Sequence, residues 1–192
     1  MRPANEGRRI LRVHVMGGQG SGKTTLARRL GALLGAPVYE LDLVGWEVGT
    51  GRERTLAEKL ARVRDIAAQP AWMTEGTMLG WSDPLLRAAD RIVWLDIPWR
   101  VALWRMLLRH MHAELAGNNR HPGWRRLFRF LWYTRKYYLN RYPSTPVPED
   151  GEGNATRRRT AQRLARYPDK AVWCRTAADV ERIVAALAPP AD

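Results

Sequence analysis

The sequence has little of what secreted and membrane-spanning proteins depend on. Its 192 residues include one cysteine, Cys174, so no internal disulfide can form. The longest apolar stretches are as short as β-strands and are interrupted by arginine, and residues 1–9 contain no apolar segment typical of a secretory signal. We therefore expect a cytoplasmic protein without a membrane span. Cys174 ends an apolar run and is predicted to be a small core residue rather than a reactive thiol.

Acidic residues are also scarce. The chain has 19 Asp and Glu against 32 Lys and Arg, a formal net charge of +13. Between Arg100 and Arg141 ten Lys and Arg residues accompany a single acid, Glu114. Such a segment either meets an anion or is solvated, and the anion could be a nucleotide, a phosphorylated acceptor or a nucleic-acid backbone. Charge alone does not choose among these, and part of the excess can be arginine without any ligand.

Other absences exclude whole classes of protein. The guanine-reading string Asn-Lys-x-Asp of GTPases does not occur, and the chain is too short for a helicase or a transporter. His110, His112 and His121 have no spacing with cysteine or acid that indicates zinc, so they are expected on a helix surface. With 45% hydrophobic residues, the chain is expected to fold as one globular domain.

Against these absences stands one complete phosphate-binding motif, G-x-x-x-x-G-K-[ST], placed between an apolar run and a helix-like segment. Its glycines let backbone N–H groups surround a phosphate at the positive end of the helix. The strand, loop and helix order disfavours the alternative of a glycine-rich turn with a chance lysine, and a bound nucleoside triphosphate is predicted. Lys23 would contact the β- and γ-phosphates, and Thr24 would bind Mg²⁺. The predicted nucleotide-binding residues are Gly17, Gly18, Gln19, Gly20, Ser21, Gly22, Lys23, Thr24 and Thr25.

Short apolar runs alternate with amphipathic helical stretches along the chain. This alternation is typical of βαβ units and predicts an α/β protein with a mostly parallel sheet between two helical layers. The five expected strands are Ile10 to Met16, Pro37 to Leu41, Ala71 to Glu75, Arg91 to Asp96 and Ala171 to Arg175. The expected helices run from Lys23 to Leu34, from Arg52 to Ala68, from an Asp83 N-cap followed by Pro84, and from the capping pattern Thr176-x-x-Asp179 to Leu187.

An inserted helical hairpin is expected between Pro98 and Tyr142. Two helices rich in Trp, Arg and Leu occur there, separated by a breaker from Gly117 to Gly123. Residues 143–153 mix proline, glycine and acids, which is typical of a mobile surface loop. We expect a single domain over residues 10–188, with 98–142 as the insertion and 1–9 and 189–192 as flexible tails.

Three carboxylates are candidates to support Mg²⁺, because each follows a strand and ligands collect at the carboxyl ends of parallel strands. Asp42 follows the second strand, Glu75 ends the third and Asp96 ends the fourth. Asp96 has the sequence context most like a metal-supporting aspartate, with a helix cap as its alternative role. Glu75 precedes Gly76, which would allow close approach of backbone to a ligand, and its alternative is an exposed charge at a strand end.

Arginine and tryptophan dominate the remaining candidates. Arg105 and Arg109 lie one helical turn apart, so they could clamp phosphates together or form part of a solvated helix face. Tryptophan interleaved with arginine can also form a base-stacking surface, although packing in the core is the more common role. The tryptophans concerned are Trp81, Trp94, Trp99, Trp104, Trp124 and Trp132.

Taken together, several segments resemble the adenylate-kinase-related proteins known as DNA topology modulation proteins. These segments are Gly17 to Thr24, Val38 to Asp42, Trp72 to Gly76, Leu95 to Pro98 and Leu103 to Arg105. The resemblance spans about residues 11–187. It implies a P-loop kinase fold of three α/β/α layers with strand order 2-3-1-4-5, an acceptor-binding helical region after Asp42, and a lid formed by the insertion.

The resemblance also implies roles for individual residues. Arg105 would pack against adenine, Arg109 would reach the transferring phosphates, and Glu75 would hold Mg²⁺ through water. Arg175, in the loop after the fifth strand, would border the adenine. Asp42 would orient or deprotonate an acceptor hydroxyl, as in small-molecule kinases of this fold.

One departure from the adenylate-kinase pattern concerns the acceptor. Adenylate kinases carry proline and an AMP-binding arginine shortly after the acid, whereas Gly76 is followed here by Thr77, Met78 and Leu79. The lost arginine would have to be replaced by one of Arg52, Arg54 and Arg87.

These observations predict an ATP- and Mg²⁺-dependent phosphotransferase that moves a γ-phosphoryl group to a small acceptor, with a nucleotide or nucleoside as the first choice. Its expected catalytic residues are Lys23, Arg109 and Asp42, and its expected metal-binding residues are Thr24, Glu75 and Asp96. The alternative is a nucleic-acid-associated regulator that binds ATP and uses the basic hairpin to contact phosphate backbones.

Overall fold

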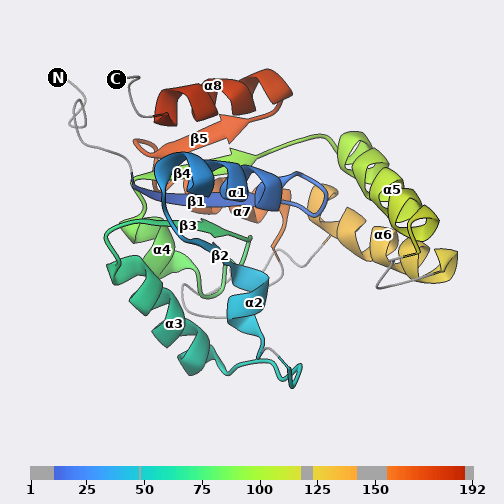
Figure 1. The fold of residues 1–192 in the computed structure, drawn as a ribbon, viewed down its shortest axis with the longest axis horizontal. Coiled ribbons are helices and arrows are strands. Elements are labelled where there is room, and N and C mark those ends of the chain that lie inside the picture. Colours follow the sequence, from blue (N-terminus) through green and yellow to red (C-terminus); the bar gives the residue numbers. More distant parts are fainter. Residues whose placement is uncertain (1–10, 48, 118–122, 142–154, 189–192) are drawn as a thin grey trace.

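A computed structural model describes residues 11–47, 49–117, 123–141 and 155–188. Five parallel strands form one sheet in the order β2-β3-β1-β4-β5, which confirms the predicted topology (Figure 1). Every observed strand lies within or next to its predicted range. The strands are β1 Arg12–Gly17, β2 Val38–Glu40, β3 Trp72–Glu75, β4 Arg91–Leu95 and β5 Ala171–Cys174.

Helices cover both faces of the sheet. On one face α1 and α8 pack against the strands, and on the other α3, α4 and α7 do so (Figure 1). A hairpin of two helices, α5 and α6, extends beyond one end of the sheet. The helices are α1 Lys23–Leu34, α2 Leu41–Gly45, α3 Leu56–Ala68, α4 Asp83–Ala88, α5 Trp99–Leu115, α6 Trp124–Tyr138, α7 Arg157–Leu164 and α8 Ala177–Leu187.

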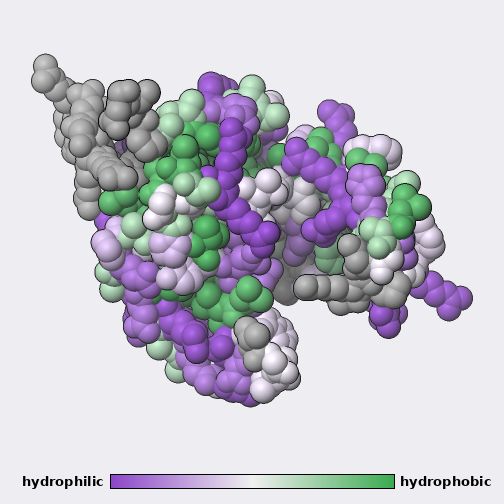
Figure 2. Space-filling model, viewed as in Figure 1, coloured by the Kyte–Doolittle hydropathy of each residue, from purple (hydrophilic) through white to green (hydrophobic). Residues whose placement is uncertain are grey.

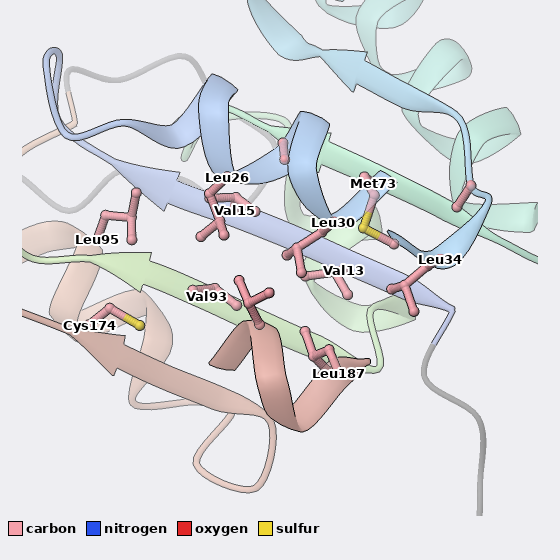
Figure 3. Packing of buried hydrophobic residues seen from close by; sticks show 13 residues of the cluster. Val13, Val15, Leu26, Leu30, Leu34, Met73, Val93, Leu95, Cys174 and Leu187 are labelled. Carbon is pink, nitrogen blue, oxygen red and sulfur yellow. The ribbon is translucent and has the colours of Figure 1, made fainter. Parts of the chain in front are cut away.

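The central strands are buried on both faces, as expected where helices cover a parallel sheet on both sides. Val13 and Val15 of β1 point toward α1 and α8, where Leu26 and Leu30 pack on them (Figure 3). Met16 of β1 belongs to the core on the opposite face. Cys174 lies fully buried in the first core, as predicted, and burial raises the pKa of its thiol to about 11.

The helix after the third strand starts one residue differently from the prediction. Ser82, not Asp83, is its N-cap. The Asp83 carboxylate is instead buried against another helix, where Oδ1 accepts from Arg163 Nη1 at 2.9 Å and from the Tyr167 hydroxyl at 3.2 Å. Arg87 Nε donates to Oδ2 at 2.5 Å. Asp83 therefore ties α4 to α7 across the second core.

The hairpin has a small core of its own, in which Met106 of α5 packs with Leu127 and Leu131 of α6. The tryptophans divide between the sheet core and the surface of the hairpin. Trp81, just before α4, and Trp94, on β4, are core residues as predicted. Trp104, Trp124 and Trp132 of the hairpin are 61%, 52% and 61% exposed, so the more common role of packing in the core does not hold for these three.

His110 also differs from its prediction. It is buried rather than on a helix surface, because it packs against the Trp124 ring and lies 3.3 Å from the Glu114 carboxylate. His112 is exposed on α5, as predicted.

The helices differ in how closely their ends match the prediction. α1 has the predicted bounds, and α8 begins at a Thr176 and Asp179 capping box. α3 begins at Leu56, after a Thr55 cap, rather than at Arg52. α2 and α7 had no clear signal and were not predicted.

Several sequence expectations lie outside the described residues: most of the hairpin breaker, the loop 143–153 and the tails 1–9 and 189–192. In the part of the chain that is described, no helix has both the length and the apolar character needed to cross a bilayer.

Candidate functional site

The phosphate loop connects the carboxyl end of β1 with the amino end of α1. Gly20 and Gly22 adopt φ of 77° and 99°, a left-handed region in which residues with a Cβ are strained. No side chain caps the first turn of α1, and that turn contains no acidic residue. Its backbone N–H groups are thus available to an anion, as the motif predicts.

The start of the loop is held by Thr77, a residue that sequence analysis did not select. Gly17 N–H donates to Thr77 Oγ1 at 2.9 Å, and the Thr77 hydroxyl donates to the Gly17 carbonyl at 3.0 Å. Thr77 lies two residues after the end of β3. Here its hydroxyl fixes the point at which the backbone leaves the sheet.

Side chains of the hairpin hold the rest of the phosphate loop by donating hydrogen bonds to the carbonyl oxygens of the loop. Arg105 Nη1 of α5 donates to the Ser21 carbonyl at 2.9 Å, and the Tyr138 hydroxyl of α6 donates to the Gln19 carbonyl at 2.7 Å. Burial raises the pKa of Tyr138, so this phenol stays protonated and able to donate. These two bonds hold the Ser21 and Gln19 carbonyl groups against the hairpin, and the N–H groups of the first turn of α1 stay available to a ligand.

Contact between hairpin and loop is close enough to require glycine. A Cβ on Gly18 would lie 2.6 Å from the Tyr138 hydroxyl, and a Cβ on Gly20 would lie 2.8 Å from the Ala102 carbonyl. The glycines thus serve two purposes, since they free the backbone conformation and also let α5 and α6 approach.

Lys23, Thr24 and Glu75 meet beside the loop. Thr24 Oγ1 donates to Glu75 Oε1 at 2.6 Å, and Lys23 Nζ lies 3.8 Å from Glu75 Oε2. Glu75 is 5% exposed, so this carboxylate is held in a protein environment rather than in bulk water. A hydroxyl and a carboxylate side by side form the oxygen donor set that Mg²⁺ prefers when phosphates and waters complete its shell.

The donor set therefore fits the metal that the motif implies. Ser21 Oγ adds a second indication of a ligand, because it is buried and has no hydrogen-bond partner among the described residues. Both observations agree with a triphosphate and its metal at this loop.

Asp96 lies apart from this group. Its buried carboxylate accepts from Arg157, with Nη2 to Oδ2 at 2.8 Å, and Arg175 Nε lies 3.5 Å from Oδ2. Asp96 thus binds two arginines at the ends of β4 and β5, and the structure brings it together with Arg175 rather than with Thr24.

A cavity of about 240 Å³ opens between the loop, α2 and α6. The space-filling view shows the molecule hollowed between α2 and the hairpin (Figure 2). Asp42 of α2 and Lys23 both line this cavity. Gly76 allows α2 to lie close to the end of β3. A side chain at this position would clash with α2, because its Cβ would lie 2.8 Å from Leu41 Cβ. The full lining is Gly17, Gly18, Gln19, Lys23, Asp42, Gly76, Thr77, Met78, Tyr133, Thr134, Tyr137 and Ala155.

A second cavity, of about 210 Å³, lies at the ends of β4 and β5. Trp173 forms one side, with the Arg175 guanidinium 5.5 Å from its ring centre and the Trp94 ring 4.8 Å away. Asp96 and Arg157 also line it. The cavity combines a flat aromatic surface with hydrogen-bonding groups at its edge.

The structure thus divides the predicted site residues into groups. Asp42 and four of the loop residues, Gly17, Gly18, Gln19 and Lys23, line the first cavity. Glu75 contacts Thr24 and Lys23, and Arg105 contacts the loop at Ser21. Arg109 is exposed one turn farther along α5, and Thr25 is exposed on α1. Sequence analysis missed Thr77, Tyr138 and Arg157, whose partners lie 60, 119 and 61 residues away.

Comparison with known proteins supports the fold and leaves the family open. No family model matches the chain. It is 29% identical over 107 residues to the uncharacterized protein YqaC of Bacillus subtilis strain 168, a match that covers 55% of this chain and 59% of that protein. The chain thus matches about three fifths of the length of this curated relative.

Among solved structures, a shikimate kinase from Bacteroides thetaiotaomicron has a TM-score of 0.50 at 13% identity, covering 93% of this chain and 96% of the other. A gluconokinase from Sinorhizobium meliloti 1021 has a TM-score of 0.49 at 17% identity, covering 94% and 97%. At this level of identity the likeness to the shikimate kinase concerns the fold alone. It agrees with the five-stranded parallel sheet of a P-loop protein.

Proposed function

We propose that the protein is an ATP- and Mg²⁺-dependent kinase that transfers the γ-phosphoryl group to a small acceptor. The observation that carries this proposal is the meeting of Lys23, Thr24 and Glu75 at a phosphate loop, next to a cavity with a carboxylate, Asp42, in its wall. A P-loop that served only as a nucleotide-dependent switch would not need an acceptor cavity there.

Each residue has a role that its position allows. Lys23 would hold the β- and γ-phosphates, and Thr24 and Glu75 would hold Mg²⁺, directly or through water. When bound there, the metal would neutralise negative charge that develops on the transferring phosphoryl group. Asp42 would orient the acceptor hydroxyl and accept its proton. Arg109 would approach the phosphates when the hairpin closes over them, and Asp96 serves to hold Arg157.

The nucleotide would extend from the loop toward the second cavity. Arg175 and Trp173 there present a surface on which a purine ring can stack, and Asp96 holds Arg157 at its edge. Arg105 would leave or share its bond to the Ser21 carbonyl to contact the nucleotide. The hairpin would then exclude water from the transferring group.

The test is a coupled ADP-release assay with ATP and Mg²⁺, run against nucleoside monophosphates, nucleosides and small alcohols. We expect at least one acceptor to raise ADP release well above the rate without acceptor, and excess chelator to abolish that increase, because the donor set needs its metal. Slow release that no acceptor changes would contradict the kinase proposal.

A second candidate function, binding of single-stranded nucleic acid, has one specific observation in its favour. The outer face of α6 exposes Trp124, Phe128 and Trp132, spaced four residues apart, and the Arg135 guanidinium lies 4.4 Å from the Trp132 ring centre. Aromatic rings beside cations are the surfaces on which unpaired bases stack. Hydrophobic and hydrophilic side chains are mixed over the hairpin in Figure 2.

If this face binds nucleic acid, Trp132→Ala is expected to lower the affinity for a single-stranded oligonucleotide by roughly tenfold, the loss of one stacked base. Affinity should also fall steeply between low and physiological salt, measured by fluorescence anisotropy. Trp46→Ala is the matched control, since Trp46 is 47% exposed at the end of α2. Equal losses in both variants, or binding that salt does not change, would remove this candidate.

A further inference from the structure

The wall of the first cavity has almost no positive charge. Among its twelve described lining residues Lys23 is the single cation and Asp42 the single anion. The Lys23 ammonium already lies 3.8 Å from Glu75 and belongs to the phosphate loop. Lys136 approaches the Tyr133 ring to 5.7 Å but does not line the cavity. An acceptor in this space would therefore meet a carboxylate and no arginine.

The arginines that could have supplied positive charge are bound elsewhere. Arg52 pairs with Glu47 at 2.6 Å and with Glu58 at 3.0 Å. Arg54 donates to three backbone carbonyls at the end of α2, including that of Val44 at 3.0 Å.

Arg87 lies even farther from the cavity. It pairs with Asp83 and lines a different pocket, beside the amino ends of the strands. None of the three candidates for the missing AMP-binding arginine lines the acceptor cavity.

Ten of the twelve described lining residues carry no formal charge. The remaining wall is polar without charge or is apolar, with hydroxyls of Thr77 and Thr134 and the bodies of Met78, Tyr133 and Tyr137.

We infer that the acceptor is a small hydroxyl compound without a phosphate or carboxylate group, neutral or positively charged, with an apolar or aromatic part. This inference rests on the proposed kinase function and narrows its substrate class, because it removes nucleoside monophosphates and sugar acids while keeping nucleosides and amino alcohols. A dianionic phosphate beside Asp42 would be repelled, and no bidentate arginine would repay its desolvation.

The transfer step balances with the residues present. The bond between the γ-phosphorus and the β–γ bridging oxygen of ATP breaks, and a bond forms between that phosphorus and the acceptor oxygen. The electron pair stays on the bridging oxygen, which leaves with ADP. The acceptor proton passes to the Asp42 carboxylate and then to water.

A bisubstrate probe tests the inference without knowledge of the acceptor. Diadenosine pentaphosphate places a second nucleotide where a nucleoside monophosphate would bind, so an enzyme that accepts a monophosphate gains roughly 100-fold or more in affinity over ATP. We expect this protein to bind diadenosine pentaphosphate no more than about twofold tighter than ATP, measured by isothermal titration calorimetry with Mg²⁺. A gain of roughly 100-fold would overturn the inference.

A pair of variants locates the source of the discrimination. Asp42→Asn is expected to raise the affinity for diadenosine pentaphosphate several-fold relative to that for ATP, because it removes the repelling carboxylate. Asp65→Asn, which removes an exposed acid on α3, should leave the ratio of these two affinities unchanged. Equal ratios in both variants would show that Asp42 does not set the charge preference and would overturn that assignment.

Matched acceptors give a second readout in the ADP-release assay. A nucleoside should raise the rate of ADP release more than its 5′-monophosphate does, and an amino alcohol should raise it more than its phosphate ester does. The opposite order would refute the inference and leave the kinase proposal intact. Failure of the protein to bind ATP at all would instead refute the kinase proposal, so the two failures can be told apart.

Discussion

Replacing Lys23 by alanine is expected to lower the rate of phosphoryl transfer by roughly 1,000-fold. The Lys23 ammonium is the single cation of the acceptor cavity wall among the described residues, and it stands beside the Thr24 and Glu75 pair. In the proposed mechanism the charge that develops on the γ-phosphate would then lose the lysine that offsets it, and Glu75 would repel the phosphates without a neighbouring cation. Single-turnover kinetics with saturating ATP and an active acceptor would measure the loss.

Arg28→Ala is the control for this substitution. Arg28 lies on the same helix, is 68% exposed and forms a surface pair with Glu40, so its removal should change the rate by less than about twofold. The melting temperature of Lys23→Ala should stay near that of the wild type, because Glu75 keeps its 2.6 Å bond from Thr24. Wild-type turnover in a folded Lys23→Ala protein would contradict the role assigned to the lysine.

Asp83→Ala is expected to destabilise the fold by about 3–5 kcal/mol, the usual cost of removing one partner of a buried ion pair. Arg163 is 7% exposed and would remain buried between α4 and α7 without its carboxylate. Tyr167 would also lose an acceptor. The measurement is urea unfolding followed by circular dichroism, with the midpoint and slope compared between variants.

The same substitution has a pH signature. Burial alone would raise the pKa of Asp83, but hydrogen bonding by Arg87 and the charges of Arg87 and Arg163 outweigh it and lower the pKa in the folded state. Because its pKa is lower in the folded state, Asp83 stabilises the fold at pH values above its unfolded pKa of about 4. This stabilisation is lost as the pH falls through the folded-state pKa. The difference in the free energy of unfolding between wild type and Asp83→Ala should therefore be largest near neutral pH and become smaller in acid.

Glu181→Ala provides the surface comparison. Glu181 accepts two hydrogen bonds from Arg29 at 2.5 and 2.7 Å, yet its side chain is 61% exposed. Water can replace those bonds, so the unfolding midpoint should move far less than in Asp83→Ala. Equal shifts in the two variants would contradict the assignment of a structural core role to Asp83.

Sequence reasoning succeeded where the signal and the structure are local. The phosphate loop, the bounds of α1 and the capping box of α8 depend on neighbours a few residues apart, and each was predicted. The five strands and their order followed from alternating apolar runs and from the family resemblance. Every one of these features can be recognised without knowledge of which helix faces which strand.

Predictions failed or stayed open where a partner lies far along the chain. Asp83 looked like a helix cap because Pro84 follows it, and nothing local showed that Arg163, 80 residues away, would bind its carboxylate. The exposed Trp104, Trp124 and Trp132 were expected in the core, since tryptophan usually packs. Their exposure depends on how two helices pair, which periodicity alone does not determine.

The two hydrogen bonds from the hairpin to the phosphate loop also set an order of events. They join residues 84 and 119 positions apart, so each closes a long loop of chain and costs conformational entropy before it forms. A growing chain has its complete phosphate motif after Thr24, yet the Ser21 carbonyl gains its partner only once α5 has docked and the Gln19 carbonyl only once α6 has docked. Nucleotide binding would then report on docking of the hairpin rather than on the motif alone.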